Sequence, residues 1–290
     1  MHVYKAYPGG KFKVLTLSYD DGKFSDRRLV EMFNQYGLKA TFNLNGGIRD
    51  QVRIPMEEWK ELYAGHEIAS HSLTHPTIAR CSTSEIVSEL VEDRLALEKI
   101  FDTPILGHAF PNGSSSAEVR QILKDLGFLY GRTITDSYCL VRATEYAKQV
   151  DKNQIPVVGE ITGFEFPEDF YAWNPTCHHN HDLLGYGKKF LELTKKQYTY
   201  LFYVWGHSYE FDRDNNWDMM EEFCKMVSHR DDIWYATNLE IVQYEEAFRR
   251  LIFTMDHHQV VNPNACSVWL SVDDGNRIVE VPGGATVNLF

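Results

Sequence analysis

Short apolar segments of strand length alternate along the chain with longer segments in which apolar residues recur at helical spacing. The expected strands are Val14–Leu17, Ala40–Leu44, Glu67–Ala69, Ile105–Ala109, Phe128–Arg132, Tyr200–Val204 and Ile233–Ala236. The expected helices are Ser82–Phe101, Ala117–Leu126, Leu183–Lys195 and Asp218–Ser228. Two capping boxes, Ser82 with Glu85 and Thr237 with Glu240, mark where helices begin. This alternation predicts a mostly parallel sheet with helices outside it, either open or closed as a barrel.

The number of strand–helix units, about seven, favours an α/β barrel with its active site at the carboxyl ends of the strands. The irregular stretch from Thr133 to Pro175 is expected to cover the mouth of that barrel. After Arg249 the pattern changes to short strands, expected at Arg249–Asp256, Ser267–Val272, Asn276–Val281 and Ala285–Leu289, with Asp274-Gly275 and Gly283-Gly284 as hairpin turns. We therefore predict a (β/α) barrel over residues 1–248 and a short β-rich C-terminal extension over residues 249–290.

The amino-acid composition disfavours some classes of binding partner. A net charge of −12 disfavours a nucleic-acid partner, and no segment approaches the roughly 18 consecutive apolar residues of a membrane span. The first residues show no signal-peptide pattern, and the five cysteines form no C-x-x-C pair. These features predict reduced thiols and a cytoplasmic location, with secretion after processing left open. The oligomeric state is left open as well.

Two adjacent carboxylates, Asp20 and Asp21, stand where an apolar strand gives way to Gly22. Adjacent strand residues point to opposite faces, so the two acids can take different roles. Like charges this close disfavour each other's ionisation unless a cation lies nearby. Read alone, the motif could equally be a strand that ends in an Asp-Gly turn.

A second stretch, Gly65 to Pro76, carries His71 and His75 four residues apart, a spacing that can place both imidazoles on one face of a helical turn. Two histidines and one aspartate would make three metal ligands and leave positions open for water, as in a catalytic site. The pair also occurs on solvated helices, but the earlier Asp-Asp-Gly favours a metal site.

Two further stretches end at the same edge of the predicted sheet. Gly107–Gly113 contains Pro-Asn-Gly, a tight turn whose backbone N–H groups could hold an oxyanion, although alone it is simply a turn. The apolar strand at 201–206 runs into His207, which could supply a general acid.

These four stretches, in this order, resemble the polysaccharide deacetylase family, which is carbohydrate esterase family 4 with its NodB-type deacetylase domain. The resemblance covers roughly residues 10 to 245. The Asp-Asp-Gly and His-Ser-x-x-His motifs match closely, and the other two match loosely. The resemblance implies a distorted (β/α) barrel, in agreement with the strand count. It also implies that Asp21, His71 and His75 bind a divalent metal, usually Zn²⁺, with Co²⁺ or Ni²⁺ as alternatives.

The same resemblance implies the remaining roles. Asp20 would be the general base that takes a proton from the metal-activated water, and His207 would protonate the leaving amine. The backbone N–H of Asn112 would stabilise the oxyanion together with the metal. Trp205 and Tyr209 are candidate substrate contacts beside His207.

The chain departs from the family pattern at three places. Many members carry an arginine where this chain has Ala109, and Arg132 is our candidate substitute for orienting Asp20. Trp205 stands where the family usually has leucine, and could reshape the pocket for the acyl methyl group. The family's Asp and Trp pair has no convincing counterpart. A histidine-rich loop, Trp173–Asp182, adds His179 as a candidate substrate contact, although most of the loop is explained as the cap of the next helix.

The sequence therefore predicts a metal-dependent hydrolase that removes N- or O-acetyl groups from a carbohydrate. An allantoinase-like hydrolase of a small cyclic amide is one alternative, favoured by the absence of a signal-peptide pattern. A metal-binding carbohydrate-recognition module without turnover is the other. Asp20 argues against the module, because a domain that only binds has no need of a base beside its metal.

Overall fold

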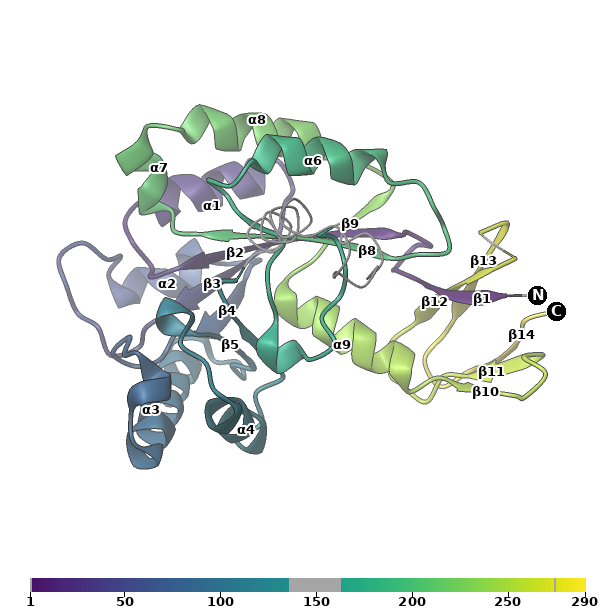
Figure 1. The fold of residues 1–290 in the computed structure, drawn as a ribbon, viewed down its shortest axis with the longest axis horizontal. Helices are drawn as coiled ribbons and strands as arrows, with labels where there is room; N and C mark the ends of the chain where they lie inside the picture. The colour runs from purple at the N-terminus through teal and green to yellow at the C-terminus, as the bar shows by residue number, and fades with distance from the viewer. Residues whose placement is uncertain (1, 136–162, 274) are drawn as a thin grey trace, which may run out of the picture.

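The computed structural model describes residues 2–135, 163–273 and 275–290, and its centre is an eight-stranded sheet (Figure 1). The strands are β2 (Lys13–Asp20), β3 (Ala40–Leu44), β4 (Glu67–Ser70), β5 (Gly107–Ala109), β6 (Tyr130–Arg132), β7 (Cys177–His178), β8 (Tyr200–Gly206) and β9 (Ile233–Tyr235). Their order is β6-β5-β4-β3-β2-β8-β7, with β9 paired to β2, and each pairing is parallel. The carboxyl ends of β2 to β8 therefore meet at one edge, whereas β9 pairs only with the first three residues of β2.

Strand β2 is the middle of this sheet, and all eight of its residues are buried. One side pairs with β8 along residues 13–19, while the other pairs first with β9 at 13–15 and then with β3 at 17–20. A parallel strand covered on both faces reads as a nearly continuous apolar run, which is why the sequence pattern located it. Its last residue, Asp20, therefore lies at the carboxyl edge of the sheet.

Helices cover the sheet in two groups (Figure 1). One group holds α1 (Asp26–Gln35), α6 (Leu183–Glu192), α7 (Tyr209–Asp214) and α8 (Trp217–Val227). The other holds α2 (Met56–Leu62), α3 (Thr83–Phe101), α4 (Ala117–Asp125) and α9 (Asn238–Arg249), and 3-10 turns occupy η1 (Ile78–Arg80), η2 (Pro111–Gly113) and η3 (Phe170–Ala172). Both predicted capping boxes form, at the starts of α3 and α9. Such caps stabilise a helix by about 1 kcal/mol each.

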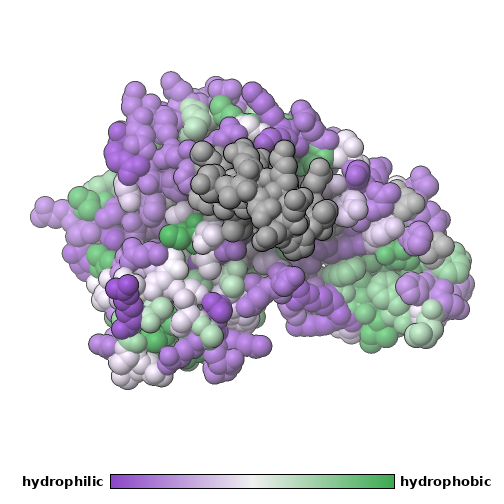
Figure 2. Space-filling view, in the orientation of Figure 1, coloured by the Kyte–Doolittle hydropathy of each residue, from purple (hydrophilic) through white to green (hydrophobic). Residues whose placement is uncertain are grey.

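A separate β structure lies at the end where both termini are found (Figure 1). One antiparallel sheet joins β1 (Val3–Ala6), β12 (Val268–Val272) and β13 (Arg277–Val281); the other joins β10 (Ile252–Phe253), β11 (Gln259–Val261) and β14 (Thr286–Asn288). Figure 2 shows apolar residues gathered on the surface here, and the exposed ones include Ile252, Met255 and Phe290. The C-terminal strands thus share a sheet with residues 3–6, a pairing that the sequence pattern did not predict.

The expected fold class is confirmed: the core is a curled parallel sheet with outer helices, consistent with a distorted (β/α) barrel that carries a small β appendage. The division at residues 248 and 249 stays a prediction. The expected cover over the mouth falls largely on residues 136–162, which lie outside the described residues. Within the described ranges, no helix combines the length and apolar character needed to cross a membrane.

Candidate functional site

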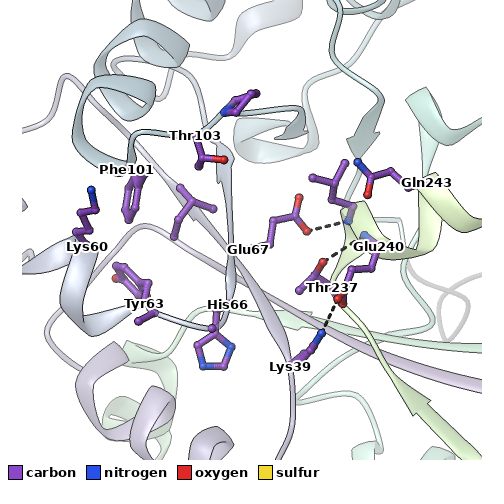
Figure 3. A pocket seen from close by; sticks show the side chains of 15 residues that line it. Lys39, Lys60, Tyr63, His66, Glu67, Phe101, Thr103, Thr237, Glu240 and Gln243 are labelled. Atoms are coloured by element: carbon purple, nitrogen blue, oxygen red, sulfur yellow. Dashed lines mark hydrogen bonds and ion pairs between the residues drawn. The ribbon is translucent and has the colours of Figure 1, made fainter. Parts of the chain in front are cut away.

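Five of the predicted site residues lie at the carboxyl edge of the sheet, on four different strands or just after them. Asp20 ends β2 and Asp21 follows it, Arg132 ends β6, and His207 follows β8. His71 follows β4 at the same edge. The opposite edge holds a cavity of about 450 Å³, lined by residues from the starts of β3, β4 and α9 (Figure 3). The predicted chemistry and this cavity are therefore at different ends of the strands.

Asp21, His71 and His75 come together as one group of donor atoms. One nitrogen or oxygen from each lies within 4.8 Å of the others, and His75 Nε2 is 3.9 Å from Asp21 Oδ1. Within the described part of the chain, Asp21 Oδ1 is buried and accepts no hydrogen bond. Asp21 and His75 hold left-handed backbone angles, with φ of 83° and 61°. Strained backbone of this kind persists where the surroundings enforce it, and it is common at functional sites.

His71 is held with Nε2 toward this group. Its Nδ1 lies 2.7 Å from the carbonyl oxygen of Ala109 and so carries the proton that the carbonyl accepts, which leaves the lone pair on Nε2. Burial lowers the pKa of His71 to about 4, so the ring is neutral at pH 7. Asp93 on α3 accepts a hydrogen bond from the backbone N–H of His71 and from the Ser70 hydroxyl. A neutral ring oriented by a hydrogen bond at its other nitrogen is what a metal ligand requires.

The His71–His75 segment is a loop and not the helical turn that the spacing allowed. Ser72 and His75 have positive φ, and Asn45 donates to the backbone carbonyls of His71 and Ser72. Pro76 also disfavours a helical conformation at the residue before it. The two imidazoles nevertheless meet, with ring centroids 4.8 Å apart.

Asp20 has its own set of partners, distinct from the metal-ligand group. The guanidinium of Arg132 and the amide of Asn43 both donate to Oδ1, the latter at 2.7 Å. His71 Nε2 lies 3.7 Å from Oδ2. Burial acts to raise the pKa of Asp20, but the adjacent Arg132 guanidinium outweighs it and holds the pKa well below its usual range. Asp20 is therefore a buried carboxylate that stays ionised.

The structure places Arg132 where the sequence analysis proposed it, although its role in turnover stays a prediction. Its side chain is fully buried, and its guanidinium also lies over the Trp205 ring, 4.9 Å from the centroid. Such cation–π contacts are worth about 2 kcal/mol when desolvated. Trp205 is 8% exposed, so one of its faces supports Arg132 instead of forming an open pocket wall.

His207 faces Asp20 from β8, with Nε2 3.9 Å from Asp20 Oδ2. Its other nitrogen, Nδ1, is 3.5 Å from Glu210 Oε2. Burial acts to lower the pKa of His207, but Glu210 and Asp20 outweigh it and raise the pKa above its usual value. Ser208, the next residue, donates to the buried Asp26 and so ties this loop to α1. The result is a histidine suited to carry a proton next to Asp20.

The other predicted site residues make fewer contacts with Asp20 and the metal-ligand group. Asn112 is exposed in the turn after β5, with φ of 55°, and Tyr209 places its ring 5.2 Å from that of His207. His179 is fully buried, stacked against Tyr19 and Phe211. Because a fully buried ring has no surface to offer a substrate, we withdraw His179 as a substrate contact.

Three residues that contact the predicted site were not found by the sequence analysis. Asn43 donates to Asp20, and its signal was a polar side chain inside an apolar strand. Arg53 donates to the backbone carbonyl of Asp21 and to Asn45 Oδ1, and no local pattern marks it. Glu210 joins His178 and His179 in a second group of possible metal donors.

Comparisons with known proteins agree with this geometry. Residues 8–131 match the family model described as polysaccharide deacetylase. The peptidoglycan-N-acetylglucosamine deacetylase PgdA of Listeria monocytogenes is 29% identical over 87 residues, which are 29% of this chain and 18% of that protein. A chitin deacetylase of Pestalotiopsis is 30% identical over 117 residues, which are 39% of this chain and 38% of that protein. The chain thus matches less than two fifths of either relative's length.

Solved structures extend the likeness in fold over most of the chain. A proposed polysaccharide deacetylase from Mycobacterium smegmatis superimposes with a TM-score of 0.57 at 16% identity, over 85% of this chain and 94% of that one. The chain therefore shares its fold with that protein. The match to the polysaccharide deacetylase family model spans residues 8–131, which are less than half of the chain.

Proposed function

We propose that this protein is a metal-dependent hydrolase that removes N- or O-acetyl groups from a carbohydrate. The observation that carries the proposal is the separation of two adjacent carboxylates. Asp21 lies in the donor group with His71 and His75, whereas Asp20 lies beside that group with its Oδ1 held by Arg132 and Asn43. An ionised base beside a metal-ligand set is the arrangement that hydrolysis needs.

The donor set fits a divalent transition metal. One carboxylate oxygen and two imidazole nitrogens suit Zn²⁺, and also Co²⁺ or Ni²⁺, while leaving coordination positions open. Asp21 Oδ1 accepts no hydrogen bond, although Arg53 Nη2 lies 3.6 Å from it, and a metal would bind this oxygen and the oriented Nε2 of His71. When bound, the metal would acidify a water molecule and polarise the acyl oxygen.

Asp20 and His207 would then each carry out one proton transfer. Water attacks the acyl carbon while Asp20 accepts its proton. The developing oxyanion would be stabilised in part by the backbone N–H of Asn112. The C–N or C–O bond breaks as His207 gives its proton to the leaving amine or hydroxyl. The products are acetate and the free amino or hydroxyl group of the sugar, so atoms and protons balance.

The substrate class follows from the matched relatives, whose names specify peptidoglycan N-acetylglucosamine and chitin. We propose an N-acetylated amino sugar as the first substrate to test. Both named substrates carry acetamido groups, and hydrolysis of an amide requires the protonated leaving group that His207 can supply.

The direct test is acetate release from N-acetylated oligosaccharides, by protein loaded with Zn²⁺ or Co²⁺ and by protein treated with a chelator. We expect activity only with metal. Asp20→Asn should keep the metal and lose turnover, whereas Asn264→Ala, in the β appendage, should keep both. A purified protein that takes up no metal and releases no acetate would rule the proposal out.

A further inference from the structure

The carboxylate of Glu210 is surrounded by three histidines. Its Oε2 lies 2.9 Å from His178 Nε2, 3.3 Å from His179 Nε2 and 3.5 Å from His207 Nδ1. The same oxygen accepts the backbone N–H of His207 at 3.3 Å. His178, His179 and Glu210 are all buried, and the sequence analysis gave no role to His178 or Glu210.

Such a group has two physical interpretations, a second metal site or a hydrogen-bonded support for His207. The spacing of the three donor atoms, all within 4.8 Å of one another, is compatible with a metal. A metal, however, needs a lone pair on each coordinating nitrogen. The protons on the imidazoles therefore decide between the two interpretations.

The tautomer of His178 excludes the metal. The backbone N–H of Asn180 donates to His178 Nδ1 at 3.2 Å, so Nδ1 holds the lone pair. In a neutral imidazole the other nitrogen then carries the proton. His178 Nε2 is a donor, and at 2.9 Å its acceptor is Glu210 Oε2.

His179 does not decide between the two interpretations by hydrogen bonding. Its Nε2 lies 3.3 Å from Glu210 Oε2, but neither ring nitrogen has a hydrogen-bond partner among the described residues. Its Nδ1 is pressed against Gly206, since a Cβ placed on that glycine would lie 2.0 Å from it. Burial lowers the pKa of His179 well below its usual value, so the ring is neutral.

We propose that Glu210 is a positioning residue for His207, anchored by His178, and that the His178–His179–Glu210 group is a hydrogen-bonded support and not a metal site. The inference rests on the proposed function, in which His207 delivers the proton. Glu210 lies in the first turn of α7, three residues after His207, and its Oε1 lies 3.5 Å from Arg213 Nη2. Its Oε2 accepts the backbone N–H of His207 and lies 3.5 Å from Nδ1, a contact that is not a hydrogen bond in this structure. The other ring nitrogen of His207, Nε2, lies 3.9 Å from Asp20 Oδ2.

The test compares Glu210→Gln with Glu221→Gln, which alters an exposed carboxylate on α8 that pairs with Lys225. We expect Glu210→Gln to lower kcat by about 10- to 100-fold with little change in KM, because supporting partners of this kind typically contribute that much. Glu210→Asp, which keeps the charge, should recover part of the loss. His178→Gln should show a smaller loss in the same direction. The Glu221 variant should match the wild type.

The pH dependence of kcat is a further test, because it would not change if Glu210 only stabilised the fold. The groups facing His207 are Asp20 and Asp21 after β2, His178 and His179 after β7, and Glu210 and Tyr209 on α7. Losing the Glu210 charge should move the alkaline limb of kcat to lower pH. An unchanged kcat and an unchanged profile would overturn the proposal.

Two further measurements, of metal content and of an NMR signal, do not depend on turnover. Zinc titration should give one metal per chain in both wild type and Glu210→Gln. If the wild type instead binds two metals and Glu210→Gln binds one, the group is a metal site.

Nitrogen NMR of the His207 ring, assigned against His207→Gln, should show a protonated Nδ1 whose signal changes in Glu210→Gln. This signal separates the two proposals: if no acetate is released but the signal changes, the deacetylase function fails and the Glu210–His207 contact stands. An unaltered signal would refute the contact itself.

Discussion

Arg132 donates a hydrogen bond to the carboxylate of Asp20, across 112 residues of sequence and from a different strand of the sheet. Both side chains are buried, so each is the main charge partner of the other. Removing one partner of a buried pair typically costs 3–5 kcal/mol, because the remaining charge is left uncompensated. Arg132 thereby supplies the contact that Ala109, at the position where the family often has arginine, cannot make.

Arg132→Met should destabilise the fold by about 3–5 kcal/mol and reduce turnover, because Asp20 loses its cation. Urea unfolding and acetate release would measure the two effects. Arg132→Lys keeps the charge but loses the fork of donors, and should lie between the wild type and Arg132→Met. Wild-type stability together with wild-type turnover in Arg132→Met would contradict the pairing.

His71→Ala should abolish stoichiometric zinc binding, since it removes the buried ligand whose Nε2 is oriented by Ala109. Elemental analysis after dialysis against zinc gives the metal content directly. His257→Ala, at an exposed histidine of the β appendage, is the matched control and should retain zinc. Full zinc content in His71→Ala would mean that the ion binds elsewhere.

Stability should fall as pH rises through the titration of Glu67, which lies beside the cavity at the opposite edge of the sheet (Figure 3). Burial raises its pKa to about 6, although the Leu239 N–H and the Tyr130 and Thr41 hydroxyls oppose the rise. The folded state therefore binds this proton more tightly than the unfolded chain does. The stabilisation is complete below the unfolded pKa near 4.5 and is lost as pH passes about 6.

This shift corresponds to about 2 kcal/mol between pH 4 and pH 7.5. Glu67→Gln should therefore show a flatter dependence of unfolding free energy on pH than the wild type, by about that amount. Urea titrations at the two pH values measure it. Asp26 and Asp93, whose pKa values burial raises to about 7, titrate in both proteins and cancel in the comparison. Parallel pH curves would show that Glu67 has the same pKa in the folded and the unfolded state.

Gly206→Ala should destabilise the fold by about 1–3 kcal/mol, the usual cost of overpacking. Its new Cβ would lie 2.0 Å from Nδ1 of the buried His179, which has no space to move into. Gly187→Ala on α6 is the matched control, because its Cβ would meet the flexible end of Met226 at 2.3 Å and would come no closer than 3.3 Å to the Phe223 ring. Thermal unfolding of the two variants distinguishes them, and equal Tm values would show that His179 can shift freely.

The sequence located residues whose chemistry is local and whose positions are set by strand ends. Asp20, Asp21, His71 and His75 stand directly after apolar segments, and parallel strands bring such positions to one edge. Glu210 could not be recognised in this way, because an acid in the first turn of a helix is ordinary capping chemistry. Its contact with His178 depends on the neighbouring strands β7 and β8, of which the first has only two residues.

Asn43 and the strand β1 show two other limits of prediction from the sequence. A polar residue inside an apolar strand is a signal, but the sequence does not say which side chain it will meet. The pairing of Val3–Ala6 with Trp269–Val272 has no local signal, because the first segment is short and half-buried and its partner lies at the other end of the chain. Pairings between such distant segments depend on the assembled barrel and not on nearby residues.

The pairing of β1 with β12 has a consequence for the order of folding. The first strand of the chain cannot find its partner until residues 268–272 have been synthesised, whereas β2, β3 and β4 can associate much earlier. Contacts between distant segments form slowly because a long loop must close first. We therefore expect the barrel to form around a loose N-terminal segment, and the pairing of β1 with β12 to be among the last steps of folding.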